Sequence, residues 1–230
     1  MDFSYLDRNI AEVRSKMDAA RIAAGRSDEV TMVAAVKSGE VGEINYLHNA
    51  LGVHDIGENR VQQLLDRYEA YDKEGLRIHF IGHLQTNKVK YIIDKVDTIH
   101  SLDSEKLAAE IDRQAAKHGI VMNVLVEINS GREPNKDGVM PEDAAALCET
   151  LTKYPHINLR GFMTMAPVCE DKTQYRRYFD EVATLAAHIW HDVLAREDAP
   201  VLSMGMSESF PQAIASGATV IRVGRRLFEK

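Results

Sequence analysis

With 230 residues, the chain is long enough for one sizeable hydrophobic core, and we expect residues 1–230 to form a single domain. Its 28 basic and 35 acidic residues give a formal net charge of −7, which repels polyanions and argues against nucleic acid as a partner. The two cysteines, Cys148 and Cys169, lack the spacing of a zinc site or a disulfide scaffold.

The N-terminal segment mixes acidic with apolar residues, so it does not have the uninterrupted apolar core of a signal peptide. No stretch of the sequence approaches the ~20 apolar residues that a bilayer-spanning helix needs. We therefore expect a cytoplasmic protein with no membrane partner. No predicted helix has a wide apolar face left over, which favours a monomer.

A helix is predicted over residues 4–24, because Leu6, Ile10 and Val13 recur at helical spacing. After it, short β-branched or apolar runs alternate with amphipathic stretches. The eight predicted strands cover residues 31–36, 53–56, 78–81, 98–102, 123–128, 159–163, 201–204 and 219–223. The helices predicted between them cover residues 42–50, 60–73, 85–94, 104–118, 141–154, 172–194 and 207–215.

This alternation indicates an α/β fold with a parallel sheet. Eight strand–helix units close most economically into a (β/α)8 TIM barrel, here with an extra N-terminal helix. An open doubly wound sheet is the alternative fold. In a barrel, functional residues lie at the carboxyl ends of the strands, and phosphate often binds after strands seven and eight.

Lys37 ends the first predicted strand, on the same face as Val33 and Ala35. Its position predicts an amine at the barrel mouth, where it could form an imine with an aldehyde. A surface lysine at a strand end is the alternative, and it would be favoured if Lys37 stood alone. A phosphate site at the same mouth reverses that preference.

Two segments near the C-terminus predict this phosphate site. The turn from Ser203 to Ser207 offers two hydroxyls and a glycine just before a predicted helix, which Ser207 can also cap. In the last strand, alternation directs Arg222 into the barrel, where a guanidinium needs an anionic or acceptor partner. A phosphate cradle together with an imine-forming lysine indicates pyridoxal 5′-phosphate (PLP) as cofactor.

Other polar residues have simpler interpretations. His79 and His83 are four residues apart, but the β-type run between them argues against a shared helix face, and we expect no metal site. Asn59 is interpreted as a helix cap or a ligand contact, with the cap favoured on local evidence. Asp103 can cap the helix predicted over residues 104–118.

Several strings, in order along the chain, resemble the PLP homeostasis protein family. They are Lys37, the segments over residues 57–62, 79–88 and 161–167, and Leu202 to Ser207. The strings over residues 79–88 and 203–207 are the most specific. The resemblance implies a single-domain barrel like the N-terminal domain of alanine racemase, which binds PLP as an imine exposed to solvent.

The resemblance also implies roles for individual residues of this chain. By this resemblance Lys37 is the imine lysine, Arg222 faces the pyridine nitrogen, and Asn59 and Met204 lie beside the ring. The phosphate is held by Ser203 and Ser207 and by the backbone of Arg222, Val223 and Gly224. Lys136 occupies the place of a family lysine implicated in a second, transient contact with the cofactor.

The sequence departs from the family pattern at two places. Ser38-Gly39-Glu40 follows Lys37 where the family usually continues Thr-Lys-Pro, so the second lysine that is thought to help cofactor hand-over is replaced. Near the C-terminus, Glu229 follows Phe228 where a glycine is usual.

Three functions from different classes fit these features. The first is a carrier that holds PLP through a reversible imine and yields it to PLP-requiring apo-enzymes, without turnover of its own. The second is an amino-acid racemase, which needs a second base on the opposite face of the cofactor. Because racemases take that base from a further C-terminal domain, we expect the carrier. The third is an imine-forming aldolase, whose lysine usually stands on a later strand.

Overall fold

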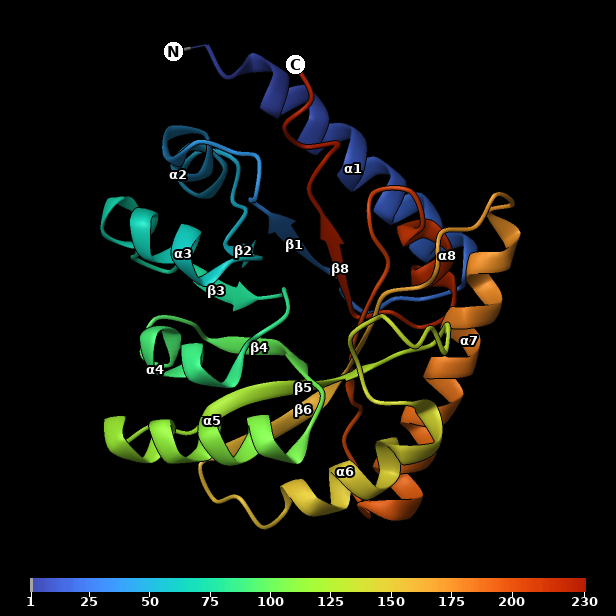
Figure 1. The fold of residues 1–230 in the computed structure, drawn as a ribbon. Helices are drawn as coiled ribbons and strands as arrows, with labels where there is room; N and C mark the ends of the chain where they lie inside the picture. Colours follow the sequence, from blue (N-terminus) through green and yellow to red (C-terminus); the bar gives the residue numbers. More distant parts are fainter. Residues whose placement is uncertain (1) are drawn as a thin grey trace.

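The computed structural model describes residues 2–230 and contains a closed barrel of eight parallel strands in chain order (Figure 1). The strands are β1 (Thr31–Ala35), β2 (Asp55–Glu58), β3 (Arg77–Phe80), β4 (Thr98–Leu102), β5 (Met122–Ile128), β6 (Ile157–Thr164), β7 (Val201–Met204) and β8 (Val220–Val223). Pairing of β1 with β8 closes the ring, so the predicted barrel is confirmed and the open sheet is excluded.

Helices follow the strands in the predicted order. They are α1 (Ser4–Ala23), α2 (Val41–Asn49), α3 (Val61–Arg67), α4 (Val89–Ile92), α5 (Glu105–His118), α6 (Ala144–Leu151), α7 (Thr173–His188) and α8 (Phe210–Ala215). Short 3-10 turns precede α4 and α6 and follow α3, and a π-helical turn, Ile189–Val193, extends α7. Four of the predicted helices are therefore at the expected positions, but each combines an α-helix with a 3-10 or π-helical turn.

The extra N-terminal helix α1 lies diagonally across the β1–β8 side of the barrel, beside α8 (Figure 1). Its residues Leu6, Ile10 and Val13 are buried in the main core, as the helical spacing predicts. The Asn9 side-chain amide donates hydrogen bonds to the carbonyls of Leu227 and Glu229, at 3.0 and 2.8 Å. Helix α1 thus holds the C-terminal segment against the barrel.

Strand alternation separates two buried regions. Side chains such as Ala34, Ile56, Phe80 and Ile221 point outward and join the large core between the strands and the helices. A smaller apolar set is buried outside that core and fills the barrel interior; it consists of Val33, Ile81 just after β3, Leu125, Met163 and Val220. The remaining interior positions are polar, and these build the site.

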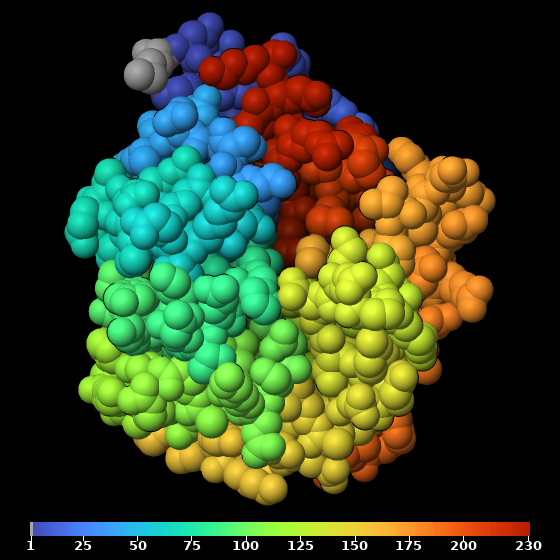
Figure 2. Space-filling view, viewed as in Figure 1, coloured from blue at the N-terminus to red at the C-terminus, as the bar shows by residue number. Residues whose placement is uncertain are grey.

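No helix within residues 2–230 is long and apolar enough to cross a membrane. The space-filling view shows the blue-cyan, green, yellow and red segments meeting around a recess in the centre of the face (Figure 2).

Candidate functional site

Lys37 comes directly after β1, at the carboxyl end of the strand, and its side chain is exposed. Two side chains of α3 hold this strand end: Gln63 donates to the Lys37 carbonyl at 3.0 Å, and Arg67 donates to the Val36 carbonyl at 3.2 Å. Ala34 pairs with Val223 of β8, so the end of β1 lies next to the loop that follows β8. Lys37 is therefore close to the loop after β8, as predicted, because β1 and β8 pair to close the barrel.

Gly39, where the resemblance expects a lysine, lies under the ring of Phe228. A Cβ atom at Gly39 would stand 2.4 Å from Cε1 of that ring, which no ordinary contact allows. A side chain at this position would therefore have to displace the Phe228 ring. The glycine that replaces the family lysine at position 39 therefore leaves room for the Phe228 ring to pack here.

The loops after β7 and β8 contain backbone N–H groups that no protein acceptor satisfies among the described residues. They belong to Ser207 and Glu208 in one loop and to Gly224 and Arg225 in the other. Glu208 and Arg225 are exposed, but Gly224 is buried and Ser207 is half-buried, and N–H groups in such places normally find a partner. One unpaired group in each loop at this end of the barrel therefore favours an anion there. The Arg222 backbone N–H is not among them, because it donates to the Gly205 carbonyl at 3.0 Å.

Helix α8 begins later than the sequence predicted. Residues 207–209 form a turn, Ser209 is the residue before the helix, and its hydroxyl accepts a bond from the Met206 N–H at 3.2 Å. The expectation that Ser207 caps the helix is wrong. The Ser207 hydroxyl makes no hydrogen bond within residues 2–230, so a ligand remains its available partner.

Arg222 points into the barrel, as strand alternation predicted, and only 4% of it is exposed. Its Nη1 donates to the carbonyl and the hydroxyl of Ser203 at 2.7 and 2.6 Å, and Nη2 donates to the Thr164 carbonyl at 2.9 Å. Burial lowers the pKa of Arg222 to about 10, and the carboxylate of Glu127 opposes that shift. The guanidinium therefore stays cationic at neutral pH.

Ser203 differs from its predicted role. Its side chain is fully buried inside the barrel, and its hydroxyl contacts Arg222 and lies 3.1 Å from His100 Nδ1. The hydroxyl is thus occupied by protein partners and positions Arg222, which leaves a phosphate contact by this group unsupported.

A chain of hydrogen bonds continues from Ser203 across the barrel interior. His100 Nε2 lies 2.9 Å from His79 Nδ1, and His79 Nε2 lies 3.0 Å from Asp55 Oδ1. The Asp55 carboxylate also accepts two bonds from Arg77, at 2.7 and 2.5 Å. Burial opposes ionisation of Asp55, but the hydrogen bonds and charges of His79 and Arg77 outweigh it and lower its pKa to about 2.

With both imidazoles neutral, the ionised Asp55 fixes the direction of every bond in this chain. Asp55 can only accept, so His79 carries its proton on Nε2 and accepts on Nδ1. His100 must then donate from Nε2 and accept on Nδ1 from the Ser203 hydroxyl, whose oxygen accepts from Arg222. Burial lowers the pKa of His100 well below its usual value, and the positive charge of Arg222 acts in the same direction, so this histidine is neutral.

Asn59 lies just before α3 and does not cap it. Arg60 is the residue before the helix, and no side chain there bonds the helix N–H groups. Asn59 Oδ1 is instead buried without a hydrogen-bond partner within residues 2–230. An unpaired buried amide oxygen is costly, so the ligand-contact interpretation now has the better support.

Met204 and Val223 do not direct side chains toward the mouth. Both are fully buried in the core between the strands and the helices, because they alternate with the inward-facing Ser203 and Arg222. The prediction that Met204 lies beside the ring therefore depends on its backbone. Only the backbone of these two residues remains available to a cofactor.

The sequence analysis missed the interior polar residues Asp55, His100 and Glu127. Each sits in a predicted strand at a position of the inward-facing set, which is the signal that would have revealed it. Of the two histidines that were considered, His79 is in the barrel interior and His83 is exposed at the mouth.

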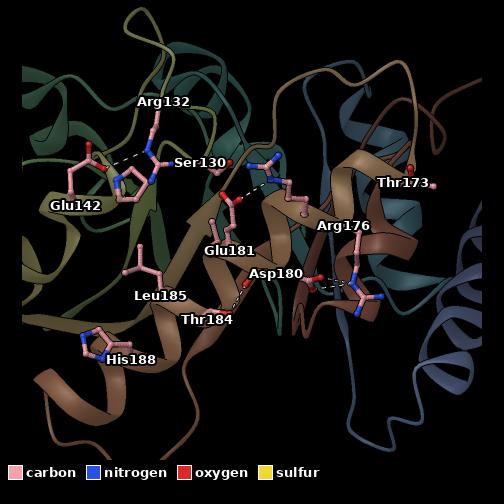
Figure 3. A pocket seen from close by; sticks show the side chains of 13 residues that line it. Ser130, Arg132, Glu142, Thr173, Arg176, Asp180, Glu181, Thr184, Leu185 and His188 are labelled. Atoms are coloured by element: carbon pink, nitrogen blue, oxygen red, sulfur yellow. Dashed lines mark hydrogen bonds and ion pairs between the residues drawn. The ribbon is translucent and has the colours of Figure 1, made fainter.

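The largest cavity, about 1230 Å³, is a groove outside the barrel between α7 and the segment after β5 (Figure 3). Its charged side chains pair with one another: Arg176 with Asp180, and Arg177 with Glu181. The groove contains none of the residues predicted to bind a cofactor. We therefore place the candidate site at the barrel mouth rather than in this groove.

Comparison with known proteins identifies the relatives of this chain. The family model described as "Alanine racemase, N-terminal domain" matches residues 2–229. A pyridoxal phosphate homeostasis protein of Aquifex aeolicus is 41% identical over 223 residues, which are 95% of either chain. The chain belongs to the pyridoxal phosphate homeostasis protein family.

Further relatives and solved structures extend the likeness. The Escherichia coli (strain K12) pyridoxal phosphate homeostasis protein is 33% identical over 226 residues, covering 96% of this chain and 94% of that protein. A structure of PipY from Synechococcus elongatus, solved with PLP bound, has a TM-score of 0.84 and 30% identity over 97% of this chain and 100% of that one. Clostridium difficile alanine racemase, at 17% identity and a TM-score of 0.74, shares the barrel fold.

Proposed function

We propose that this chain binds PLP through an imine on Lys37 and acts as a carrier in intracellular PLP homeostasis, without turnover. The observation that carries the proposal is the closure of the barrel by β1 and β8, which sets Lys37 beside the unpaired N–H groups of Gly224 and Arg225. The names of the relatives and the PLP-bound PipY structure support the same cofactor. We further propose that residues 1–230 are one domain, that the chain is a cytoplasmic monomer, and that its protein partners are PLP-requiring apo-enzymes.

The phosphate fits the two loops with free N–H groups. We assign it to the N–H groups of Ser207 and Gly224 and their neighbours, with the Ser207 hydroxyl as a further donor. We also propose that the backbone of Val223 and Met204 contacts the cofactor. A dianion at this position would satisfy donors that have no acceptor in the protein.

Arg222 fits the pyridine nitrogen. Three of its five N–H groups are used by Ser203 and Thr164, which leaves two donors for a ligand. Because its pKa is lowered only to about 10, this guanidinium is cationic at neutral pH, and it has no lone pair with which to accept a proton. A cation opposite the ring nitrogen disfavours its protonation, and this weakens the electron-withdrawing power that PLP supplies to carbanion chemistry when bound.

Asn59 fits the edge of the ring, because its buried Oδ1 has no partner in the protein. Lys136 lies exposed in the loop after β5, and we propose that it makes the second, transient contact during release. These assignments suit a protein that holds PLP and lets it go.

Retention of the cofactor tests the proposal. The protein is loaded with PLP and passed through a desalting column, and the PLP that remains bound is measured by absorbance. We expect Lys37→Ala to lose the cofactor, and Lys153→Ala, which changes an exposed lysine beyond α6, to keep it. Equal retention by both variants would contradict the role of Lys37.

A racemase is the alternative function. Incubation of the loaded protein with single enantiomers of the common amino acids, followed by chiral chromatography, separates the two. If the protein is a carrier, we expect it to form no more of the opposite enantiomer than free PLP does. Steady formation of the opposite enantiomer, abolished by Lys37→Ala, would establish the racemase instead.

A further inference from the structure

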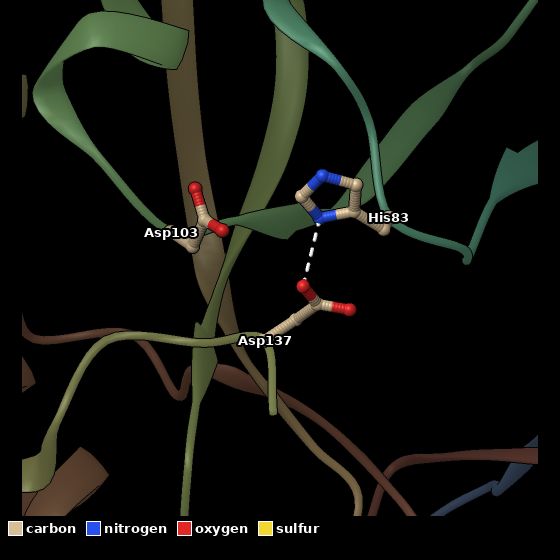
Figure 4. Close-up of side chains that lie close together, drawn as sticks. All are labelled: His83, Asp103 and Asp137. Carbon is tan, nitrogen blue, oxygen red and sulfur yellow. Dashed lines mark ion pairs between the residues drawn. The ribbon is translucent and has the colours of Figure 1, made fainter. Parts of the chain in front are cut away.

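Three potential metal ligands meet at the barrel mouth, apart from the lysine and the phosphate loops (Figure 4). They are His83, Asp103 and Asp137, and one ligand atom of each lies within 4.8 Å of the others. They come from the segments that follow β3, β4 and β5, so three neighbouring strands bring them together. His83 Nδ1 and Asp137 Oδ1 are 2.9 Å apart.

The backbone fixes this arrangement on two sides. Asp137 precedes Gly138, whose φ of +101° favours glycine and whose Cβ position would stand 2.8 Å from the Asn129 backbone nitrogen. The Val139 N–H donates to the Glu127 carbonyl at 2.8 Å, which ties this loop to the end of β5. Asp137 is therefore held over the mouth by main-chain contacts.

Asp103 is free for a ligand, contrary to the prediction that it caps α5. The hydroxyl of Ser104 accepts the capping bond, from the Leu107 N–H at 3.4 Å. Within residues 2–230, the Asp103 carboxylate has neither a hydrogen-bond nor an ion-pair partner. Two carboxylates near one imidazole thus leave one negative charge without compensation.

A further carboxyl group lies behind the three. Glu127 is only 3% exposed, and its side chain makes no hydrogen bond with any described residue. Pairing of Leu102 with Val126 sets Asp103 beside Glu127 on the inward face, and the Val139 bond brings the Asp137 loop to the same place. Arg222 offsets part of the charge of Glu127, but Asp103 and Asp137 add two further acidic groups close to it, and a cation bound there would offset their charge.

We propose that His83, Asp103 and Asp137 bind a divalent first-row transition-metal ion, such as Mn²⁺ or Zn²⁺. One imidazole nitrogen and two carboxylate oxygens form a three-ligand set of the kind these ions accept, with water in the remaining positions. The sequence analysis expected no metal, because it considered only His79 with His83, and these two residues are separated in the fold.

Bound metal would restrain the loop that bears Lys136, because Asp137 is the next residue along the chain. An ion pair between His83 and Asp137 alone would not require Asp103 as a third group. His188 and Asp192 provide the comparison, since their Nδ1 and Oδ2 atoms are 2.8 Å apart on the exposed side of the barrel with no third ligand grouped with them.

To test this site, the purified protein is titrated with Mn²⁺, and binding is measured as the decrease of the free-ion signal in electron paramagnetic resonance. We expect saturable binding of one ion, at least tenfold weaker in Asp103→Asn and Asp137→Asn and unchanged in Asp192→Asn. Binding should persist in Lys37→Ala, which separates the site from metal held by PLP and from the proposed carrier function. Absence of saturable binding below 1 mM Mn²⁺ (roughly −4 kcal/mol), or equal binding by all variants, would overturn the proposal.

Discussion

The guanidinium of Arg222 and the hydroxyl of Ser203 are joined by a hydrogen bond of 2.6 Å inside the barrel. This bond begins a chain that runs through His100 and His79 to Asp55, so the residue assigned to the pyridine nitrogen is held by partners on four other strands. The interior of the barrel therefore determines where Arg222 points and that it remains a donor.

Ser203→Ala should destabilise the cofactor-free protein by about 1–3 kcal/mol, because it leaves His100 Nδ1 buried without a donor. Urea unfolding measures this cost. Ser101→Ala is the matched control, since the Ser101 hydroxyl is buried without any partner and its removal should change the free energy of unfolding by less than ~0.5 kcal/mol. Equal costs for the two substitutions would contradict the positioning role of Ser203.

His100 should be neutral, with its proton on Nε2, throughout pH 5–8. Its lowered pKa follows from burial and from the positive charge of Arg222, so acid in this range should not protonate it. Side-chain nitrogen chemical shifts in nuclear magnetic resonance report both the charge and the tautomer. A doubly protonated His100, or a proton on Nδ1, would refute the direction assigned to the hydrogen-bond chain.

Glu127→Gln should change the pH dependence of stability. Burial raises the pKa of Glu127 to about 7, with Arg222 opposing and Asp137 and Asp103 adding to the rise. Because the folded pKa lies above the unfolded one, the protonated form stabilises the fold below about pH 4.5, and that stability is lost as the pH rises through 7. Relative to the variant, the wild type should lose on the order of 3 kcal/mol between these limits.

Chemical denaturation of both proteins at pH 5 and pH 8, with a chelator present, gives this difference. Parallel changes in the two proteins across that range would mean that Glu127 ionises at an ordinary pH.

Asn59→Ala should leave the stability of the cofactor-free protein within about 0.5 kcal/mol of the wild type, because Asn59 neither caps α3 nor pairs its Oδ1. The same substitution should raise the dissociation constant for PLP at least threefold. Fluorescence titration with PLP measures the second effect. A large loss of stability with unchanged affinity would show that Asn59 has a structural role only.

The barrel and the positions of Lys37 and Arg222 were predictable because they follow from local signals. Apolar runs alternate with amphipathic helices, and a period of two directs Arg222 into the barrel interior, whereas Lys37 follows directly after β1 and is exposed. The same period also excludes a shared face for Ser203 and Met204, which the assignment of both to the cofactor overlooked.

The interior network was not predictable in the same way. Asp55, His79, His100 and Ser203 stand on four strands, and their contacts depend on register and on barrel closure rather than on neighbours in the sequence. The start of α8 was missed by three residues because Ser207 and Ser209 are equally good caps by type, and only the turn geometry selects Ser209.

Reduction of the PLP-loaded protein with borohydride, followed by peptide mapping by mass spectrometry, tests the central claim most directly. Borohydride converts an imine into a stable secondary amine, so the label marks the lysine that holds the cofactor. We predict a visible-edge absorption band that borohydride removes and a single labelled residue, Lys37. A label on other lysines with Lys37 unmodified would contradict the assignment of this site.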